Sequence, residues 1–164
     1  MDLGYLKIKI DIKAEHDEYK KKYEYKRKEM KREEIKKIFD GFKEFFKTEG
    51  HFKFKENEHS VAAEYREHAI KLDMDIYSNV DSDDFKLSGV IKTFEKDTYE
   101  FIVEGLSNID LTLPQPDITD HERMIHDTRY YKDFLEGNLT YTFEYRINGR
   151  EGKYINMIGL LTAL

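Results

Sequence analysis

The residues best suited to metal-assisted chemistry are two carboxylates in the stretch LDMDI, Asp73 and Asp75. They alternate with apolar Leu72, Met74 and Ile76, so the pattern predicts a strand that carries both carboxylates on one face. Two carboxylates with this spacing can bridge hard cations such as Mg²⁺ and position a triphosphate. A divalent-metal-dependent enzyme of the nucleotidyl-transfer type is therefore one hypothesis.

This stretch resembles the metal-binding strand of polymerase-β-type nucleotidyltransferases, in which a Gly-Ser pair precedes the strand. Here the corresponding position reads His59-Ser60 without the glycine, and nothing marks Glu100 or Glu104 as a third carboxylate. In a chain with 34 acidic residues, an alternating strand with a wet face produces Asp-x-Asp by composition alone. We therefore expect no catalytic residue, no metal site and no cofactor, and keep the enzyme as an alternative.

Other catalytic and metal-binding patterns fail on spacing. The stretch SNVDSDD lacks the glycine and the distal glutamate of a calcium-binding EF-hand loop. The histidines of HERMIH, His121 and His126, are five residues apart, whereas a zinc-peptidase helix needs them four apart on one face. The chain contains no cysteine, which excludes disulfides and thiolate metal sites.

Charge is unevenly distributed along the chain. The net charge is −6, but residues 1–55 hold 17 Lys and Arg against 12 Asp and Glu, whereas residues 56–164 hold 11 against 22. An acidic surface suits fast, steered association with a basic partner. We therefore expect a small, non-catalytic, acidic binding protein of the inhibitor or immunity type, encoded by a bacterium or a phage, whose partner is another protein. The expected partner-binding residues are Asp73, Asp75, Asp81, Asp83 and Asp84.

A basic stretch near the N-terminus raises the alternative of nucleic-acid binding. Lys and Arg make up eight of the thirteen residues from Lys20 to Arg32. Clustered cations neutralise phosphates, and nearby tyrosines can stack on unpaired bases. The acidic chain as a whole, and the small share of Arg, favour instead a solvated helix face. The basic patch comprises Lys20, Lys21, Lys22, Lys26, Arg27, Lys28, Lys31 and Arg32.

Two further alternatives stay open at this point. Tyr and Phe are plentiful enough to line an aromatic pocket, so a small-ligand-binding module is a second alternative. Opposite charge at the two ends of the chain also permits pairing of two copies, with Tyr19, Tyr23 and Met30 as the contact.

Hydrophobic periodicity predicts the elements of an α+β protein. We expect a mostly antiparallel sheet of about seven strands, packed against one long N-terminal helix and one shorter helix. The shorter helix starts at a capping box, Thr119 with Glu122, and stops at Gly137. The expected strands lie in GYLKIKIDIK, GHFKFKEN and AIKLDMDIY, in the hairpin FKLSGVIKTF and TYEFIVEGL, and in a last hairpin turning at Asn148-Gly149.

The long helix is expected from Glu15 to Lys47, but its two halves carry their apolar residues on different faces. Tyr19, Tyr23 and Met30 fall about 120° away from the apolar stripe of residues 35–46 when plotted on a helix. One straight helix cannot place both sets on one core. Either the helix bends near residues 30–34, with its first half protruding, or residues 19–28 form another strand.

The remaining expectations concern the organisation of the whole chain. The stretch SNVDSDD is expected to be a polar loop, and LPQPDITD, which holds both prolines, is the expected connector. We expect a single domain over residues 1–164. No run of apolar residues is long enough to cross a membrane, and the N-terminus lacks a signal-peptide pattern, so we expect a cytoplasmic protein with no membrane partner.

Overall fold

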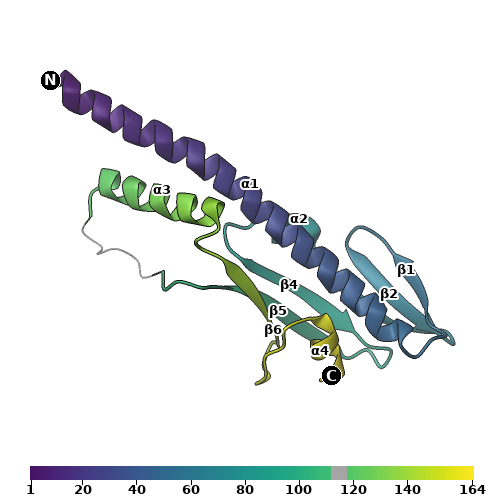
Figure 1. Cartoon of the computed structure of the whole chain (residues 1–164). Coiled ribbons are helices and arrows are strands. Elements are labelled where there is room, and N and C mark those ends of the chain that lie inside the picture. Colours follow the sequence, from purple (N-terminus) through teal and green to yellow (C-terminus); the bar gives the residue numbers. More distant parts are fainter. Residues whose placement is uncertain (112–117) are drawn as a thin grey trace. The chain divides into compact units, whose positions relative to one another are not determined.

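The computed structural model describes residues 1–111 and 118–164 and shows an α+β protein (Figure 1). Six strands form one antiparallel sheet in the order β1-β2-β3-β4-β5-β6, where about seven strands were expected. The strands are β1 (Lys53–Glu56), β2 (Ser60–Tyr65), β3 (His68–Asp73), β4 (Lys86–Lys92), β5 (Thr98–Ser107) and β6 (Tyr141–Ile147). The helices of the described residues are α1 (Leu3–Lys47), α2 (Ile76–Asp81), α3 (Asp120–Glu136) and α4 (Met157–Thr162).

The described residues fall into two compact units. Unit 1 comprises Met1–Arg27 and Ser107–Thr142, and unit 2 comprises Lys28–Leu106 and Phe143–Leu164. α1 and β6 each contribute residues to both units. The expectation of a single domain stays a prediction.

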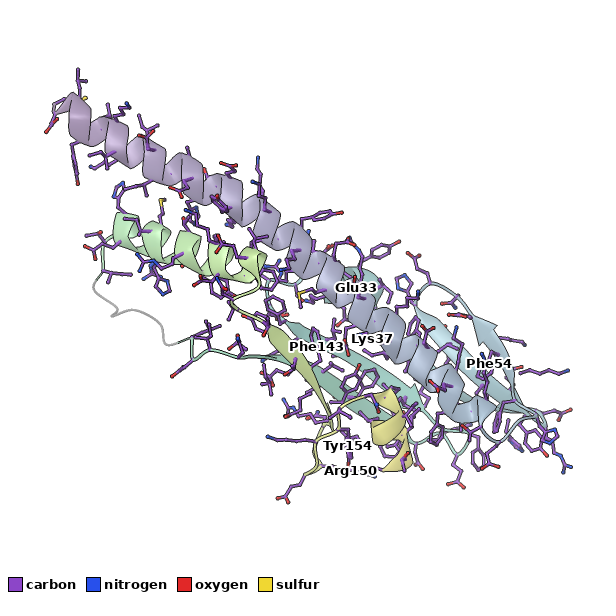
Figure 2. The ribbon with its side chains drawn as sticks, in the orientation of Figure 1. Glu33, Lys37, Phe54, Phe143, Arg150 and Tyr154 are labelled. Carbon is purple, nitrogen blue, oxygen red and sulfur yellow. The ribbon has the colours of Figure 1, made fainter. Side chains whose placement is uncertain are left out.

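Unit 2 contains the main hydrophobic core. Residues of β2 to β5 that share one face of the sheet are apolar and buried, because alternate residues of a strand point to the same side. α1 covers that face with the apolar stripe expected from the sequence, which comprises Ile35, Ile38, Phe39, Phe42 and Phe46. Phe54, Phe143 and Tyr154 pack against the same core (Figure 2).

Unit 1 is held together by aromatic packing between α1 and α3. The Tyr23 ring stacks on Tyr131, with centroids 4.7 Å apart, and meets Tyr130 and Phe134 edge-on. The limits expected for α3 are confirmed: Thr119 Oγ1 accepts the Glu122 N–H, and Gly137 ends the helix with φ of +82°. On this helix Thr128 and Phe134 are buried, whereas Ile125 is exposed.

The predicted strand in GYLKIKIDIK was wrong, because these residues are the start of α1. Asp2 marks the start: its carboxylate accepts the Tyr5 N–H at 3.2 Å, and its backbone oxygen accepts the Leu6 N–H. A helix satisfies its own backbone hydrogen bonds, whereas a strand needs a neighbour. The apolar side chains of this segment are consequently exposed, Ile8 by 56% and Ile10 by 58%.

α1 is one continuous helix, so the alternative strand at 19–28 was wrong, whereas the expected bend near residues 30–34 stays a prediction. Its two apolar faces do not share a core. Tyr23 is buried against α3 in unit 1, and the stripe of residues 35–46 is buried against the sheet in unit 2. Because Tyr23 is buried against α3, it is not exposed for the contact between two copies expected at Tyr19, Tyr23 and Met30.

β3 ends earlier than expected, at Asp73. The stretch SNVDSDD was expected to be a polar loop, but its first four residues belong to α2. In the last hairpin the turn at Asn148-Gly149 follows β6, but the returning chain makes only the Tyr145–Tyr154 bridge before α4 begins. Most of the expected connector LPQPDITD lies outside the described residues. No helix in the described part of the chain is both long and apolar enough to cross a membrane.

Candidate functional site

The short helix α2 is fixed to unit 2 by polar contacts on its inner side. Asp75 caps it, accepting the Ser78 N–H on its carboxylate at 3.4 Å. The buried Asn79 side chain donates to the backbone oxygens of Asp75 and Ser88 and accepts the Ser88 N–H, which ties α2 to β4. His59 Nδ1 accepts the Ile76 N–H at 3.1 Å. These bonds fix the backbone of α2 and leave its other side to solvent.

The outer side of α2 carries an exposed aromatic ring among carboxylates. Tyr77 is 60% exposed, and its hydroxyl donates to Glu58 Oε1 at 2.8 Å. This hydrogen bond and the charge of the carboxylate raise the pKa of Tyr77 above its ordinary value. Three further exposed carboxylates lie on or beside the helix. We call the set the α2 acidic surface; it comprises Glu58, Asp75, Tyr77, Asp81 and Asp83.

A groove of about 410 Å³ adjoins the α2 acidic surface. Glu58 belongs to both, and Ile76, the first residue of α2, also lines the groove. Its apolar lining comes from Ile35, Phe39 and Ile76. Charged side chains of both signs line it as well, namely Arg32, Lys36, Lys43, Asp40, Glu56 and Glu58. Lys43 Nζ lies 3.2 Å from Glu56 Oε2, so part of this charge is paired within the groove.

Of the five predicted partner-binding residues, Asp75, Asp81 and Asp83 lie exposed at α2. Asp73, Asp81 and Asp84 each have a lysine of their own chain within 4 Å. Asp73 lies 3.4 Å from Lys71 Nζ and 3.9 Å from Lys92 Nζ. Asp84 accepts from the buried Lys31 ammonium at 3.3 Å. These lysines offset the charges of Asp73 and Asp84, and Lys28, 3.9 Å from Asp81, offsets part of the charge of that exposed carboxylate.

The strand predicted to carry both Asp73 and Asp75 does not exist in that form. β3 ends at Asp73, and Asp75 caps α2 instead of continuing the strand. The pair therefore lacks the shared strand face on which the metal-enzyme hypothesis depended. Among residues 1–111 and 118–164, no group of three or more His, Asp or Glu side chains is arranged to hold a metal ion.

The predicted basic patch is divided between solvent and the protein interior. Lys26 donates to the Phe134 backbone oxygen at 2.7 Å, Arg27 is 3% exposed, and the Lys31 side chain is fully buried. Lys28 lies 3.9 Å from Asp81. The cations left on the surface are Lys20, Lys21, Lys22 and Arg32. Lys22 and Arg32 pair with Glu18 and Glu29 of the same helix. A continuous cationic strip along residues 20–32 is therefore not formed.

Two residues of the α2 acidic surface, Glu58 and Tyr77, were not predicted from the sequence. Glu58 lies in the β1–β2 turn, far from α2 in sequence, and only the fold brings it to the Tyr77 hydroxyl. Tyr77 stands in a stretch expected to be strand, where its exposure on a helix could not be foreseen.

No protein-family model matches the chain, and no significant similarity to a curated protein or to a solved structure is found.

Proposed function

We propose that this chain is a non-catalytic binding protein that engages a basic surface of another protein through the α2 acidic surface. The observation that carries the proposal is Tyr77, a large aromatic side chain that is 60% exposed and donates a hydrogen bond to the exposed carboxylate of Glu58. Tyr is enriched among the residues that dominate binding energy, because its ring buries much area with few rotatable bonds.

The charges around Tyr77 give the proposed interface its selectivity. Carboxylates steer a basic partner into encounter and repel acidic ones. The rigid attachment of α2 through Asn79 keeps these groups in place before the partner arrives, which lowers the ordering cost of association. An inhibitor that covers a basic groove of its target works in this way.

The test compares capture of a protein partner from a lysate of the source cells by three immobilised proteins. The wild type is compared with Tyr77→Ala/Asp81→Lys, which removes the ring and reverses one charge of the α2 acidic surface. The matched control is Tyr25→Ala/Asp17→Lys, the same two changes at exposed positions of α1.

We expect one protein that the wild type and the control retain at low salt, that high salt releases, and that the α2 variant binds at least about tenfold more weakly. Equal retention by all three proteins would contradict the proposal. Retention of nucleic acid that depends on Lys20, Lys21 and Lys22 would point instead to the basic patch.

A further inference from the structure

An apolar hollow lies on the β2–β3 hairpin in unit 2, separate from the α2 acidic surface. Its volume is about 240 Å³, and it is lined by Phe52, Ala63, Tyr65, His68, Ala69, Ile70 and Phe94. Lys, Arg, Asp and Glu are absent from this lining. The hollow therefore has the surface chemistry of a core but remains open to solvent.

Strand register explains why an apolar face is left open here. Val61 pairs with Leu72, Ala63 with Ile70 and Tyr65 with His68, so these pairs follow one another along one face of the hairpin. Val61 and Leu72 are fully buried in the core, whereas Tyr65 at the far end is 41% exposed. Burial of this face thus decreases toward the β2–β3 turn, and the hollow lies at its exposed end.

Aromatic rings form the sides of the hollow. The rings of Phe52 and Tyr65 lie 5.5 Å apart, and those of His68 and Phe94 lie 5.4 Å apart. The Arg66 guanidinium lies 5.4 Å from the centre of the Tyr65 ring, a cation–π contact that helps to fix the ring. Rings tilted in this manner offer both faces and edges to a flat guest.

We propose that this hollow binds a small, uncharged, planar aromatic molecule of one or two rings. Because no Lys, Arg, Asp or Glu side chain lines the hollow, an uncharged ligand loses less hydration there than an ion does. An apolar cavity of about 150 Å³ accommodates benzene in another protein, so about 240 Å³ leaves room for two fused rings. The site is distinct from the α2 acidic surface, and its occupancy does not depend on the proposed function.

Indole is the probe for the test. Since the chain has no Trp, indole fluorescence excited beyond the tyrosine absorption band is free of protein background. We expect saturable binding to the full chain with a Kd between about 10 μM and 1 mM, within the limits for a ligand of this size. Removing two ring walls in Tyr65→Ala/Phe94→Ala should weaken binding at least about tenfold, because stacking contacts and buried area are both lost.

The matched control is Tyr25→Ala, which removes an exposed ring outside the hollow and should leave indole binding unchanged. Circular dichroism checks that each variant is folded. If the double variant is unfolded, Phe94→Ala alone gives the comparison, since Phe94 is 54% exposed and lies in the β4–β5 turn. Indole binding that does not saturate, or that persists unchanged without these rings, would overturn the proposal.

Discussion

Lys31 has its ammonium group inside unit 2, where it donates to Ser82 Oγ at 2.6 Å and to Asp84 Oδ1 at 3.3 Å. A buried cation is tolerated only when it is paired and hydrogen-bonded. Here the stretch after α2 supplies those partners, so Lys31 joins α1 to the start of β4. This role is structural, and it removes Lys31 from the surface available to any anionic ligand.

We expect Lys31→Met to lower the free energy of unfolding by about 1–3 kcal/mol, because Ser82 and Asp84 lose their donor while the aliphatic packing is largely kept. Half-exposure of Asp84, which lets water replace part of the lost contact, keeps the figure below that of a fully buried pair. Urea unfolding measures it. Lys28→Met is the control: its ammonium lies 3.9 Å from an exposed Asp81, so its change should stay within about 0.5 kcal/mol. Equal effects of the two substitutions would contradict the prediction.

Asp84 also gives unit 2 a predictable response to acid. Burial alone would raise the pKa of its carboxyl, but hydrogen bonds from the Lys86 N–H and the Ser82 hydroxyl, together with the charge and hydrogen bond of Lys31, lower it overall. A carboxyl with a lowered folded pKa stabilises the protein above its unfolded pKa of about 3.9, and this stabilisation is lost as pH falls through the folded value.

We therefore expect Asp84→Asn to be less stable than the wild type at pH 7, and the difference to shrink as pH falls below about 4. Urea unfolding of both proteins at a series of pH values checks this. Taking the difference between the two cancels the other carboxyls of the chain. A difference that stays constant across the series would mean that the bonds around Asp84 do not depend on its ionisation.

α1 buries two faces that point in different directions, and at the scale of elements this is its defining property. The two sets of apolar residues lie about 120° apart around a helix. Each set has its own partner, which is α3 in unit 1 and the sheet in unit 2. Each half of the helix is therefore covered by a different element.

Tyr23→Ala should loosen α3, because Tyr23 contacts three rings of that helix and hydrogen-bonds the Tyr130 hydroxyl at 3.2 Å. Loss of a buried aromatic side chain costs about 3 kcal/mol or more, and a single helix as short as α3 is marginal without its cover. Hydrogen exchange should show faster exchange of the α3 amides. Tyr25→Ala removes a ring that is 68% exposed on the same helix and should leave this exchange rate unchanged. Unchanged protection in Tyr23→Ala would show that α3 does not depend on this contact.

Local signals explain which elements could be predicted. The cap at Thr119, the glycine at 137, the β4–β5 hairpin and the stripe of residues 35–46 each rest on neighbours in sequence, and all are present in the structure. Residues 4–13 alternate like a strand, but only a second strand could have held them in that form. Asp75 likewise fits a strand or a helix cap, and the contacts of His59 and Asn79 from other segments decide between them.

The candidate site was accessible to sequence reasoning only in part. Carboxylates near α2 were visible as a run of acidic residues, so Asp75, Asp81 and Asp83 could be named. The lysines that neutralise Asp73 and Asp84 come partly from distant segments, as does Glu58 beside Tyr77. Which charges cancel and which remain on a surface depends on long-range pairing, and a single sequence does not contain that information.

At the scale of the molecule, the main hydrophobic cluster of the described residues lies in unit 2. Every member of its buried cluster lies in Lys28–Leu106 or Phe143–Leu164. Two hydrogen bonds join the two ends of the segment that separates these stretches. The Asn108 N–H donates to the Thr140 backbone oxygen at 3.0 Å, and the Thr140 N–H donates to Asn108 Oδ1 at 2.8 Å. A short turn can therefore replace what lies between them.

We expect a shortened chain, residues 28–108 joined through Asn-Gly to residues 140–164, to fold on its own, because it keeps the complete core and gains a favourable hairpin turn. Cooperative urea unfolding with a circular dichroism spectrum of mixed helix and sheet checks this. Phe42→Ala in the same shortened chain should lower stability by about 3–5 kcal/mol, since Phe42 is fully buried. A gradual transition that Phe42→Ala does not shift would show that unit 2 is not an independent folding unit.

The order of strands in the sheet also has a consequence for biosynthesis. β1 to β5 pair in the order in which they leave the ribosome, so each pairing joins segments that are close in sequence, the kind of contact that forms quickly. β6 and α4 come last, after α3, yet they carry the core residues Tyr145, Met157 and Leu160. A nascent chain that has not reached them holds β5 as an unpaired edge above an incomplete core. Synthesis of β6 and α4 is thus the step that covers this edge and completes the core, and we expect it to lower the tendency of the growing chain to aggregate.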